Sequence, residues 1–193
     1  MTARAAAIAG LIGLSLLLAG CSSDDLANDF GGGAGETTTG GATVVAQKER
    51  GDSLDFEEKT IDGSTLSLAE LRGDVVVVNF WYAGCAPCRA EAPILQGLSE
   101  DYADKGVSFV GVNTVDQAAT ALSFEKKYGI GYPSVLDVES GAARIAFAGQ
   151  IAPSAVPTTF VLDRDGRIAA RIVGQLESKS ILNTLISETL AEQ

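Results

Sequence analysis

The most informative stretch of this 193-residue sequence reads Trp81-Tyr82-Ala83-Gly84-Cys85-Ala86-Pro87-Cys88-Arg89. The residues before the cysteines, Val75 to Trp81, are almost all apolar and rich in β-branched side chains, which predicts a strand buried on both faces. Ala86 to Ala103 carries apolar side chains at helical spacing and predicts a helix. The two cysteines therefore lie at a strand-to-helix turn, three residues apart, close enough to form a disulfide with little backbone movement.

The start of a helix gives the two thiols different chemistry. Cys85 faces unpaired N–H groups and the positive end of the helix dipole, which should lower the pKa of its thiol below the ~8.5 of a free cysteine. Cys88 lies one turn further along and is expected to be more buried and to remain a thiol until it reacts. Pro87 is tolerated because the first helical turn offers no partner for the N–H that proline lacks.

The composition excludes several classes of function. The chain has 14 Lys and Arg against 25 Asp and Glu, a net charge of −11, which argues against nucleic-acid binding. It has no His, which excludes His-dependent proteases, His-ligated haem and most zinc sites. With Cys21 as the only other cysteine, a four-ligand zinc site cannot be built from Cys and His, so we expect no metal and no cofactor. An inert structural disulfide remains the alternative for an exported protein.

The N-terminal residues 1–20 are typical of an export signal. Arg4 is the only charge before Cys21, and the apolar run Ala5 to Ala19 is shorter than the about 20 residues that span a bilayer. Leu17-Leu18-Ala19-Gly20-Cys21 resembles the bacterial lipobox, which implies a lipid on Cys21 that holds the chain at the membrane. An ordinary or uncleaved signal with a chance cysteine is the alternative.

The composition then divides the remaining chain in two. Residues 21–51 are rich in Gly, Thr, Ser and Asp, without sustained apolar periodicity, and predict a flexible tether. Residues 52–193 predict one α/β domain, in which Asp62-Gly63 is typical of a hairpin turn. The order of elements implies a mixed sheet covered by helices on both faces. Besides the strand and helix above, the predicted strands are Phe56–Thr60, Thr65–Ser67, Val107–Val112, Thr158–Leu162 and Ile168–Val173, and the predicted helices are Gln117–Tyr128 and Lys179–Ala191.

Three further stretches complete a pattern around the cysteines: Asn79-Phe80-Trp81 before them, Arg89, Glu91 and Pro93 after them, and Val156-Pro157-Thr158-Thr159-Phe160 further on. With these, the domain resembles the thioredoxin family, specifically the membrane-tethered ResA/TlpA-like thiol–disulfide oxidoreductases. The resemblance implies a thioredoxin-like fold with an N-terminal β-hairpin. The weaker patterns at Ser134–Leu136 and Ala142–Ala148 then correspond to the strand–helix insertion of the TlpA branch.

The resemblance also implies roles for individual residues. Pro157 is expected to be cis and to lie against Cys85, while Val156 presents its backbone to a substrate strand. Together with Trp81, Ala86 and Pro87, Val156 would border the substrate groove; a plain core role for Trp81 is equally consistent with the sequence.

Three polar positions bear on the mechanism. Thioredoxin has a buried Asp where this chain has Asn79, so the usual proton acceptor for the resolving thiol is missing. Asp116 matches an acidic residue that ResA-like proteins place near the thiols, although a helix N-cap explains it equally well. Glu91 is interpreted as a first-turn carboxylate that complements the helix dipole.

The predicted function is that of an exported, lipid-anchored thiol–disulfide oxidoreductase, most simply a reductase. The thiolate of Cys85 would attack a substrate disulfide, Cys88 would resolve the mixed disulfide, and a membrane thiol–disulfide donor would reduce the pair again. The resemblance suggests apocytochrome c among the exported substrates. Ala86-Pro87 lacks the His of the strongest oxidants, which favours a reducing potential.

Three other functions are alternatives to that of a reductase. The same chemistry run backwards makes an oxidant or isomerase of exported proteins, and a non-enzymatic binding lipoprotein is the alternative from another class. The pattern Pro-x-x-x-Thr-x-x-Cys of peroxiredoxins is absent before Cys85, which disfavours a peroxidase.

Overall fold

The computed structural model describes residues 36–39, 41–150 and 155–192. The chain divides into the units Met1–Gly33 and Ala34–Gln193, and all described residues belong to the second. The predicted export signal, Cys21 and the tether up to residue 35 lie outside the described residues. None of the helices in the described part has the length and apolar character needed to cross a membrane.

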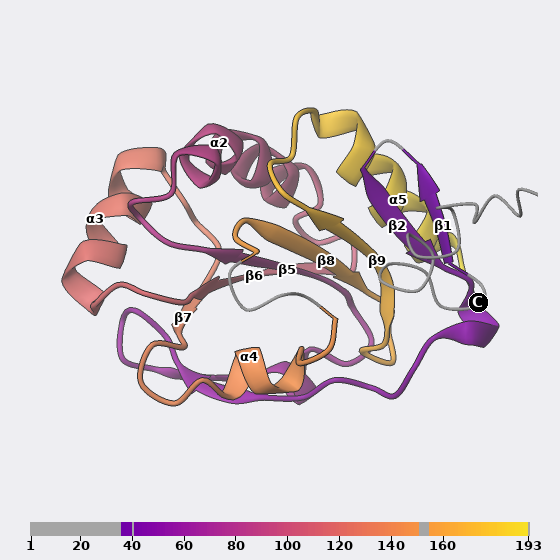
Figure 1. The fold of residues 1–193 in the computed structure, drawn as a ribbon, viewed down its shortest axis with the longest axis horizontal. Helices are drawn as coiled ribbons and strands as arrows, with labels where there is room; N and C mark the ends of the chain where they lie inside the picture. Colours follow the sequence, from indigo (N-terminus) through magenta and orange to yellow (C-terminus); the bar gives the residue numbers. More distant parts are fainter. Residues whose placement is uncertain (1–35, 40, 151–154, 193) are drawn as a thin grey trace, which may run out of the picture. The chain divides into compact units, whose positions relative to one another are not determined.

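A seven-stranded mixed sheet forms the centre of the described unit, in the order β1-β2-β9-β8-β5-β6-β7 (Figure 1). The pairs β5–β6 and β6–β7 are parallel and the other pairs are antiparallel, so the sheet is mixed, as predicted. The strands are β1 Glu36–Thr39, β2 Ala42–Val45, β5 Val75–Trp81, β6 Val107–Asn113, β7 Ser134–Leu136, β8 Thr158–Leu162 and β9 Ile168–Val173. A separate hairpin joins β3 Glu57–Lys59 to β4 Thr65–Ser67.

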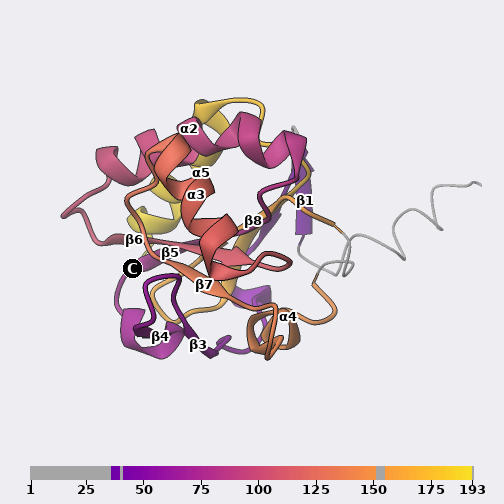
Figure 2. The ribbon, with the colours of Figure 1, turned by 90° about the vertical axis from the view of Figure 1, so that its left-hand side faces the viewer.

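Helices and the hairpin cover the two faces of this sheet. Figures 1 and 2 both show α2, α3 and α5 on one face and α4 with the β3–β4 hairpin on the other. The helices are α2 Ala86–Asp101, α3 Ala118–Tyr128, α4 Ala142–Ala146 and α5 Lys179–Ala191, with short 3-10 turns at Gln47–Glu49 and Leu68–Leu71. The strand β7 and the helix α4 confirm the predicted strand–helix insertion.

Strand β5 is buried along its whole length and separates two apolar clusters. Val76, Val78 and Phe80 pack toward the hairpin and α4, in one cluster with Phe147 and Phe160. Val75 and Val77 pack toward α2 and α5, in a cluster that includes Leu95, Leu98, Leu182 and Ile186. The sheet thereby holds the end of β5, where the cysteine segment begins, in a rigid position.

The prediction of a flexible tether through residue 51 is wrong from Glu36 onward. Strand β1 pairs with β2, and β2 adds to the edge of the sheet by pairing Ala42 with Ile172. The physical reason is a hairpin signal within the Gly- and Thr-rich segment. β-Branched residues flank Gly40-Gly41, and the register pairs Thr39 with Ala42, leaving a two-residue connection of a kind that favours glycine. The domain therefore begins about 16 residues earlier than predicted.

Candidate functional site

Cys85 and Cys88 form a disulfide at the start of α2, with an S–S distance of 2.01 Å and 5.3 Å between their Cα atoms. Cys85 is the N-cap residue of the helix, and its Sγ accepts a hydrogen bond of 3.1 Å from the backbone N–H of Cys88. Once the pair is reduced, this N–H and the helix dipole favour the thiolate of Cys85. The strand-to-helix placement predicted for the dithiol is confirmed.

The disulfide is packed into an apolar cluster between α2 and α3. The exposed fraction is 4% for Cys85 and 2% for Cys88, so the predicted difference in burial is small in the oxidised form. Trp81 is buried in the same cluster, and its ring lies 4.4 Å from that of Phe124 on α3. The structure thus places Trp81 in the core beneath the disulfide, and its contact with substrate stays a prediction.

The accessible side of the disulfide is formed by the residues between the cysteines and by the proline segment. Ala86 is exposed and Pro87 is half-buried. The Val156–Pro157 peptide bond is cis, and Val156 packs against the cluster that contains both cysteines. The carbonyl of Pro157 accepts a hydrogen bond of 2.9 Å from the Gly174 N–H. The cis bond is confirmed, whereas the contact of Pro157 with Cys85 stays a prediction.

Asp116 lies at the loop that carries Cys85. Its Oδ2 accepts hydrogen bonds from the Ala83 N–H at 2.6 Å and from Asn113 Nδ2 at 2.9 Å. The N-cap residue of α3 is Gln117, and no side-chain hydrogen bond caps that helix. The N-cap interpretation of Asp116 is therefore wrong. The carboxylate instead holds the backbone two residues before Cys85, whereas a role as acid or base stays a prediction.

The interpretation of Glu91 as a first-turn carboxylate is also wrong. The first turn of α2 has no acidic residue, and Glu91 is fully buried. Glu91 Oε1 accepts from Asn79 Nδ2 and Oε2 from the Leu176 N–H, both at 2.8 Å. Asn79 Nδ2 also donates to Thr159 Oγ1 at 3.0 Å, so the amide holds the carboxyl to the sheet. The interpretation failed because the loop before α5 closes over this turn of α2.

The environment of Glu91 suits proton chemistry near neutral pH. Burial raises its pKa to about 7, although the hydrogen bonds from Leu176 and Asn79 act in the opposite direction. Cys88 and Glu91 stand three residues apart on α2, the spacing that brings two side chains onto one face of a helix. The sequence signal for the pair of Cys88 and Glu91 is an acidic residue three positions after the second cysteine, together with an Asn in the preceding strand.

A cysteine pair at a helix N-terminus, above a mixed sheet and beside a cis-proline, defines a thioredoxin-fold thiol–disulfide oxidoreductase. The model of the Redoxin family matches residues 48–186 of this sequence. The chain belongs to the Redoxin family, and within it is a ResA/TlpA-like protein of the thioredoxin superfamily.

Individual relatives agree with this assignment. The thiol–disulfide oxidoreductase ResA of Bacillus subtilis (strain 168) is 29% identical over 133 residues, which cover 69% of this chain and 72% of ResA. A thioredoxin-family thiol:disulfide interchange protein from Chlorobium tepidum TLS is 31% identical, with a TM-score of 0.68 over 76% of this chain and 100% of its own. A secreted thiol–disulfide isomerase from Corynebacterium glutamicum is 26% identical, with a TM-score of 0.72 over 82% of this chain and 100% of its own.

Proposed function

We propose that the chain is an extracytoplasmic reductase of protein disulfides. Cys85 attacks the substrate disulfide and forms a mixed disulfide, and Cys88 then attacks Cys85 Sγ and releases the substrate as a dithiol. The single observation that carries the reducing direction is the buried carboxyl of Glu91, one helical turn beyond Cys88.

Glu91 favours the reducing direction through its charge. A carboxylate close to a thiol raises the free energy of a thiolate at the same place, because two like charges repel each other in a poorly solvated site. Strong oxidants of this fold owe their potential to a stabilised reduced form. A neighbouring negative charge makes the reduced pair less stable. The pair therefore has a lower reduction potential and gives its electrons more readily to a substrate disulfide. The Ala86-Pro87 dipeptide, which has no cationic side chain, acts in the same direction.

The proposal includes the position of the enzyme in the cell envelope. Residues 1–20 act as an export signal, and a lipid on Cys21 holds the domain at the outer surface of the membrane. Exported proteins with disulfides are its partners, apocytochrome c is the candidate substrate, and a membrane thiol–disulfide donor restores the dithiol. The lipobox-like sequence before Cys21 and the similarity to ResA support these assignments.

A second candidate is an oxidant or isomerase of exported proteins. It is favoured by the likeness to the C. glutamicum protein, a secreted thiol–disulfide isomerase. Both candidates use the same two cysteines, and the reduction potential of the pair separates them. A binding lipoprotein without enzymatic activity would not need the Cys85–Cys88 pair.

The experiment that tests the proposal is a redox titration of the described domain against thiol–disulfide buffers, with the Cys85–Cys88 state read from alkylation and mass. We expect a potential closer to the about −270 mV of thioredoxin than to the about −120 mV of the periplasmic oxidase. A value near the oxidase would establish the second candidate. If none of the buffers reduces the Cys85–Cys88 disulfide while the protein is folded, the disulfide is structural.

A further inference from the structure

A small cavity beside Cys88 has mainly apolar walls, but it also carries polar side chains for which the exchange chemistry above has no use. Its volume is about 10 Å³, enough for one water molecule at most. Cys88 and Asn79 line it from α2 and β5, and Tyr132 and Ser134 line it from the segment that enters β7. The resolving thiol therefore shares a confined space with a phenol and a hydroxyl.

Ser134 is the first of two residues in this region with an unsatisfied buried oxygen. It is 2% exposed, and its Oγ has no hydrogen-bond partner among the described residues. Gly111 on β6 pairs with Ser134, and a Cβ at Gly111 would overlap the Ser134 hydroxyl and come within 2.8 Å of Trp81 Nε1. The hydroxyl thus occupies space that only a glycine leaves free, directly beneath the site.

Glu125 on α3 is the second such residue. The side chain is half-buried, and its Oε1 is buried without a hydrogen-bond partner among the described residues. Burial raises the pKa of Glu125, the nearby Ser134 hydroxyl lowers it, and the charge of Asp62 in the β3–β4 turn raises it. Glu125 therefore lies near Ser134, while part of its side chain reaches solvent.

Tyr132 lies close enough to both Glu125 and Glu91 for their charges to act on it. Burial raises the pKa of the phenol, and the charges of Glu91 and Glu125 raise it further. Both carboxyl groups thus act on the same phenol, which lines the Cys88 cavity. Glu91 has no exposed surface and cannot exchange a proton with water directly, whereas Glu125 can.

We propose that Ser134 and Glu125 relay a proton between Cys88 and solvent when the mixed disulfide is resolved. The thiol of Cys88 gives its proton to Ser134 Oγ, directly or across one water molecule, and the proton of the Ser134 hydroxyl moves to Glu125 Oε1. The Cys88 thiolate then attacks Cys85 Sγ, the Cys85–substrate S–S bond breaks, and the leaving thiolate takes up a proton from water. Glu125 returns its proton to solvent, so that atoms and charge balance.

This inference rests on the thiol–disulfide exchange of the site and holds for either direction of net electron flow. The groups that act on Glu125 are Asp62 from the hairpin and Ser134 from β7, and Glu125 in turn acts with Glu91 on Tyr132. The test therefore compares whole pH profiles.

The test follows single turnover of the reduced domain with dithiobis-nitrobenzoate, an aromatic disulfide that releases a coloured thiolate. The first equivalent is released when Cys85 attacks and the second when Cys88 resolves. We expect Ser134→Ala and Glu125→Gln to slow the second release about tenfold or more near neutral pH and to change its pH profile. The first release should stay within about twofold of the parent.

The controls separate a relay from a structural effect. Ser123→Ala, on the exposed side of α3, and Glu188→Gln, exposed on α5, should leave both releases unchanged. Ser134→Ala removes a hydroxyl that has no hydrogen-bond partner in the described part of the chain and is expected to fold, and Glu125→Gln provides an independent second variant. An unchanged second release in both variants, or equal slowing of both releases, would overturn the relay. Failure of the parent to release any second equivalent would instead overturn the exchange activity on which the proposed function depends.

Discussion

Asn79 donates its side-chain amide to Glu91 across 2.8 Å, and this bond links the central strand to the helix that carries the dithiol. The sequence places Asn79 where thioredoxin has an acid, which predicts that the usual proton acceptor for the resolving thiol is missing. The structure instead places the acid on α2 and uses the strand residue to orient it. An amide suits that position because it donates to Glu91 and Thr159 at once, which a carboxylate could not do.

The first prediction concerns the stability cost of Glu91. Its pKa is about 7 in the fold against the 4.5 of an ordinary glutamate side chain, so the folded state binds more protons between these values. The free energy of unfolding should therefore fall by about 3 kcal/mol as the pH rises from about 4.5 to about 7, and level off above that. Urea unfolding of the oxidised domain across this pH range measures the decrease.

Glu91→Gln supplies the matching variant. Glutamine lacks one of the two acceptor oxygens that face Asn79 and Leu176, so the variant should be less stable than the parent in acid. Because it does not ionise, the gap should close as the pH rises. The exposed Glu188→Gln should follow the parent at every pH. A parent profile parallel to that of Glu91→Gln would contradict the assignment.

The second prediction assigns the roles of the two thiols. Cys88→Ser leaves Cys85 as a nucleophile at the helix N-terminus but removes the attack that releases the substrate, so mixed disulfides should accumulate. Cys85→Ser should accumulate none, because Cys88 lies within the helix and lacks the N-cap position that favours the thiolate of Cys85. Non-reducing gels of cells that express each variant compare the trapped adducts, and equal trapping would reverse the assignment.

The third prediction separates charge from positioning at Asp116. Asp116→Asn keeps an oxygen that can accept from the Ala83 N–H, whereas Asp116→Ala does not. If the negative charge restrains Cys85, both variants should be alkylated at Cys85 about threefold faster near neutral pH. If the carboxylate only holds the loop, Asp116→Ala alone should change. Alkylation of the reduced domain, measured as a function of pH, distinguishes these results.

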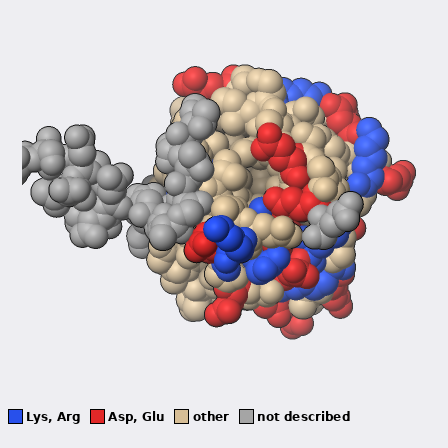
Figure 3. Space-filling model, turned by 90° about the vertical axis from the view of Figure 1, so that its right-hand side faces the viewer, with Lys and Arg blue, Asp and Glu red and all other residues tan. Residues whose placement is uncertain are grey.

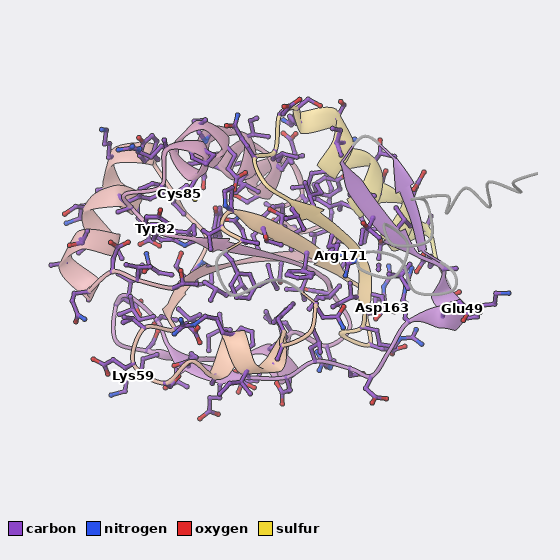
Figure 4. The ribbon with its side chains drawn as sticks, viewed as in Figure 1. Glu49, Lys59, Tyr82, Cys85, Asp163 and Arg171 are labelled. Atoms are coloured by element: carbon purple, nitrogen blue, oxygen red, sulfur yellow. A yellow bond between two sulfur atoms is a disulfide. The ribbon has the colours of Figure 1, made fainter. Side chains whose placement is uncertain are left out.

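The fourth prediction concerns an ion-pair network far from the disulfide. Arg50, whose side chain is 2% exposed, donates to both oxygens of Glu192 at 2.6 Å and to Asp163 at 3.0 Å. On the face drawn in Figure 3, acidic and basic side chains gather around a hollow. Asp163 and Glu192 line a cavity of about 610 Å³. Figure 4 shows Asp163 well separated from Cys85.

Arg50→Met keeps the apolar stem and removes the guanidinium that joins the segment before β3 to the end of α5. We expect a loss of about 2 kcal/mol in the free energy of unfolding, less than for a fully buried pair because Glu192 is partly exposed. Asp163 keeps its contact with Arg167. Chemical denaturation measures the loss, and the thiol-exchange rate of the folded variant should equal that of the parent.

The fifth prediction tests the membrane anchor. Cys21→Ser removes the thiol that would receive the lipid, so the expressed chain should lose the mass of the lipid and move from the detergent phase to the aqueous phase. Mass spectrometry and detergent partitioning make the comparison. A Cys21→Ser chain with the same partitioning as the parent would rule out lipidation at this residue.

The sequence predicted the site best where chemistry and local pattern coincide. The buried run from Val75 to Trp81, the helix that follows and the spacing of Cys85 and Cys88 placed the dithiol at the N-terminus of α2. Local rules suffice there, because strand, turn and helix start are each specified by neighbouring residues. The cis peptide bond before Pro157 came from family resemblance, since the sequence allows it before any proline.

The features that the sequence did not predict depend on contacts between segments that are far apart in the chain. Glu91 is buried because Leu176, 85 positions later, supplies an N–H to its carboxyl. Ser134 lies under the site because β7 pairs with β6 at Gly111. The Gly- and Thr-rich composition predicts a tether and hides the β-branched pattern around Gly40-Gly41, which forms β1 and β2. The pairing of β2 with β9 joins residues about 130 positions apart, which no local pattern specifies.

The added hairpin has a mechanical consequence for an enzyme attached through Cys21. With the sheet beginning at Glu36, fourteen residues separate the sheet from the anchoring thiol. Fully extended, they cover at most about 50 Å, half of the roughly 100 Å that a tether running to residue 51 would allow. If Cys21 carries the proposed lipid, the edge strand would set the distance that the dithiol can reach above the bilayer and would restrict its substrates to disulfides close to the membrane surface.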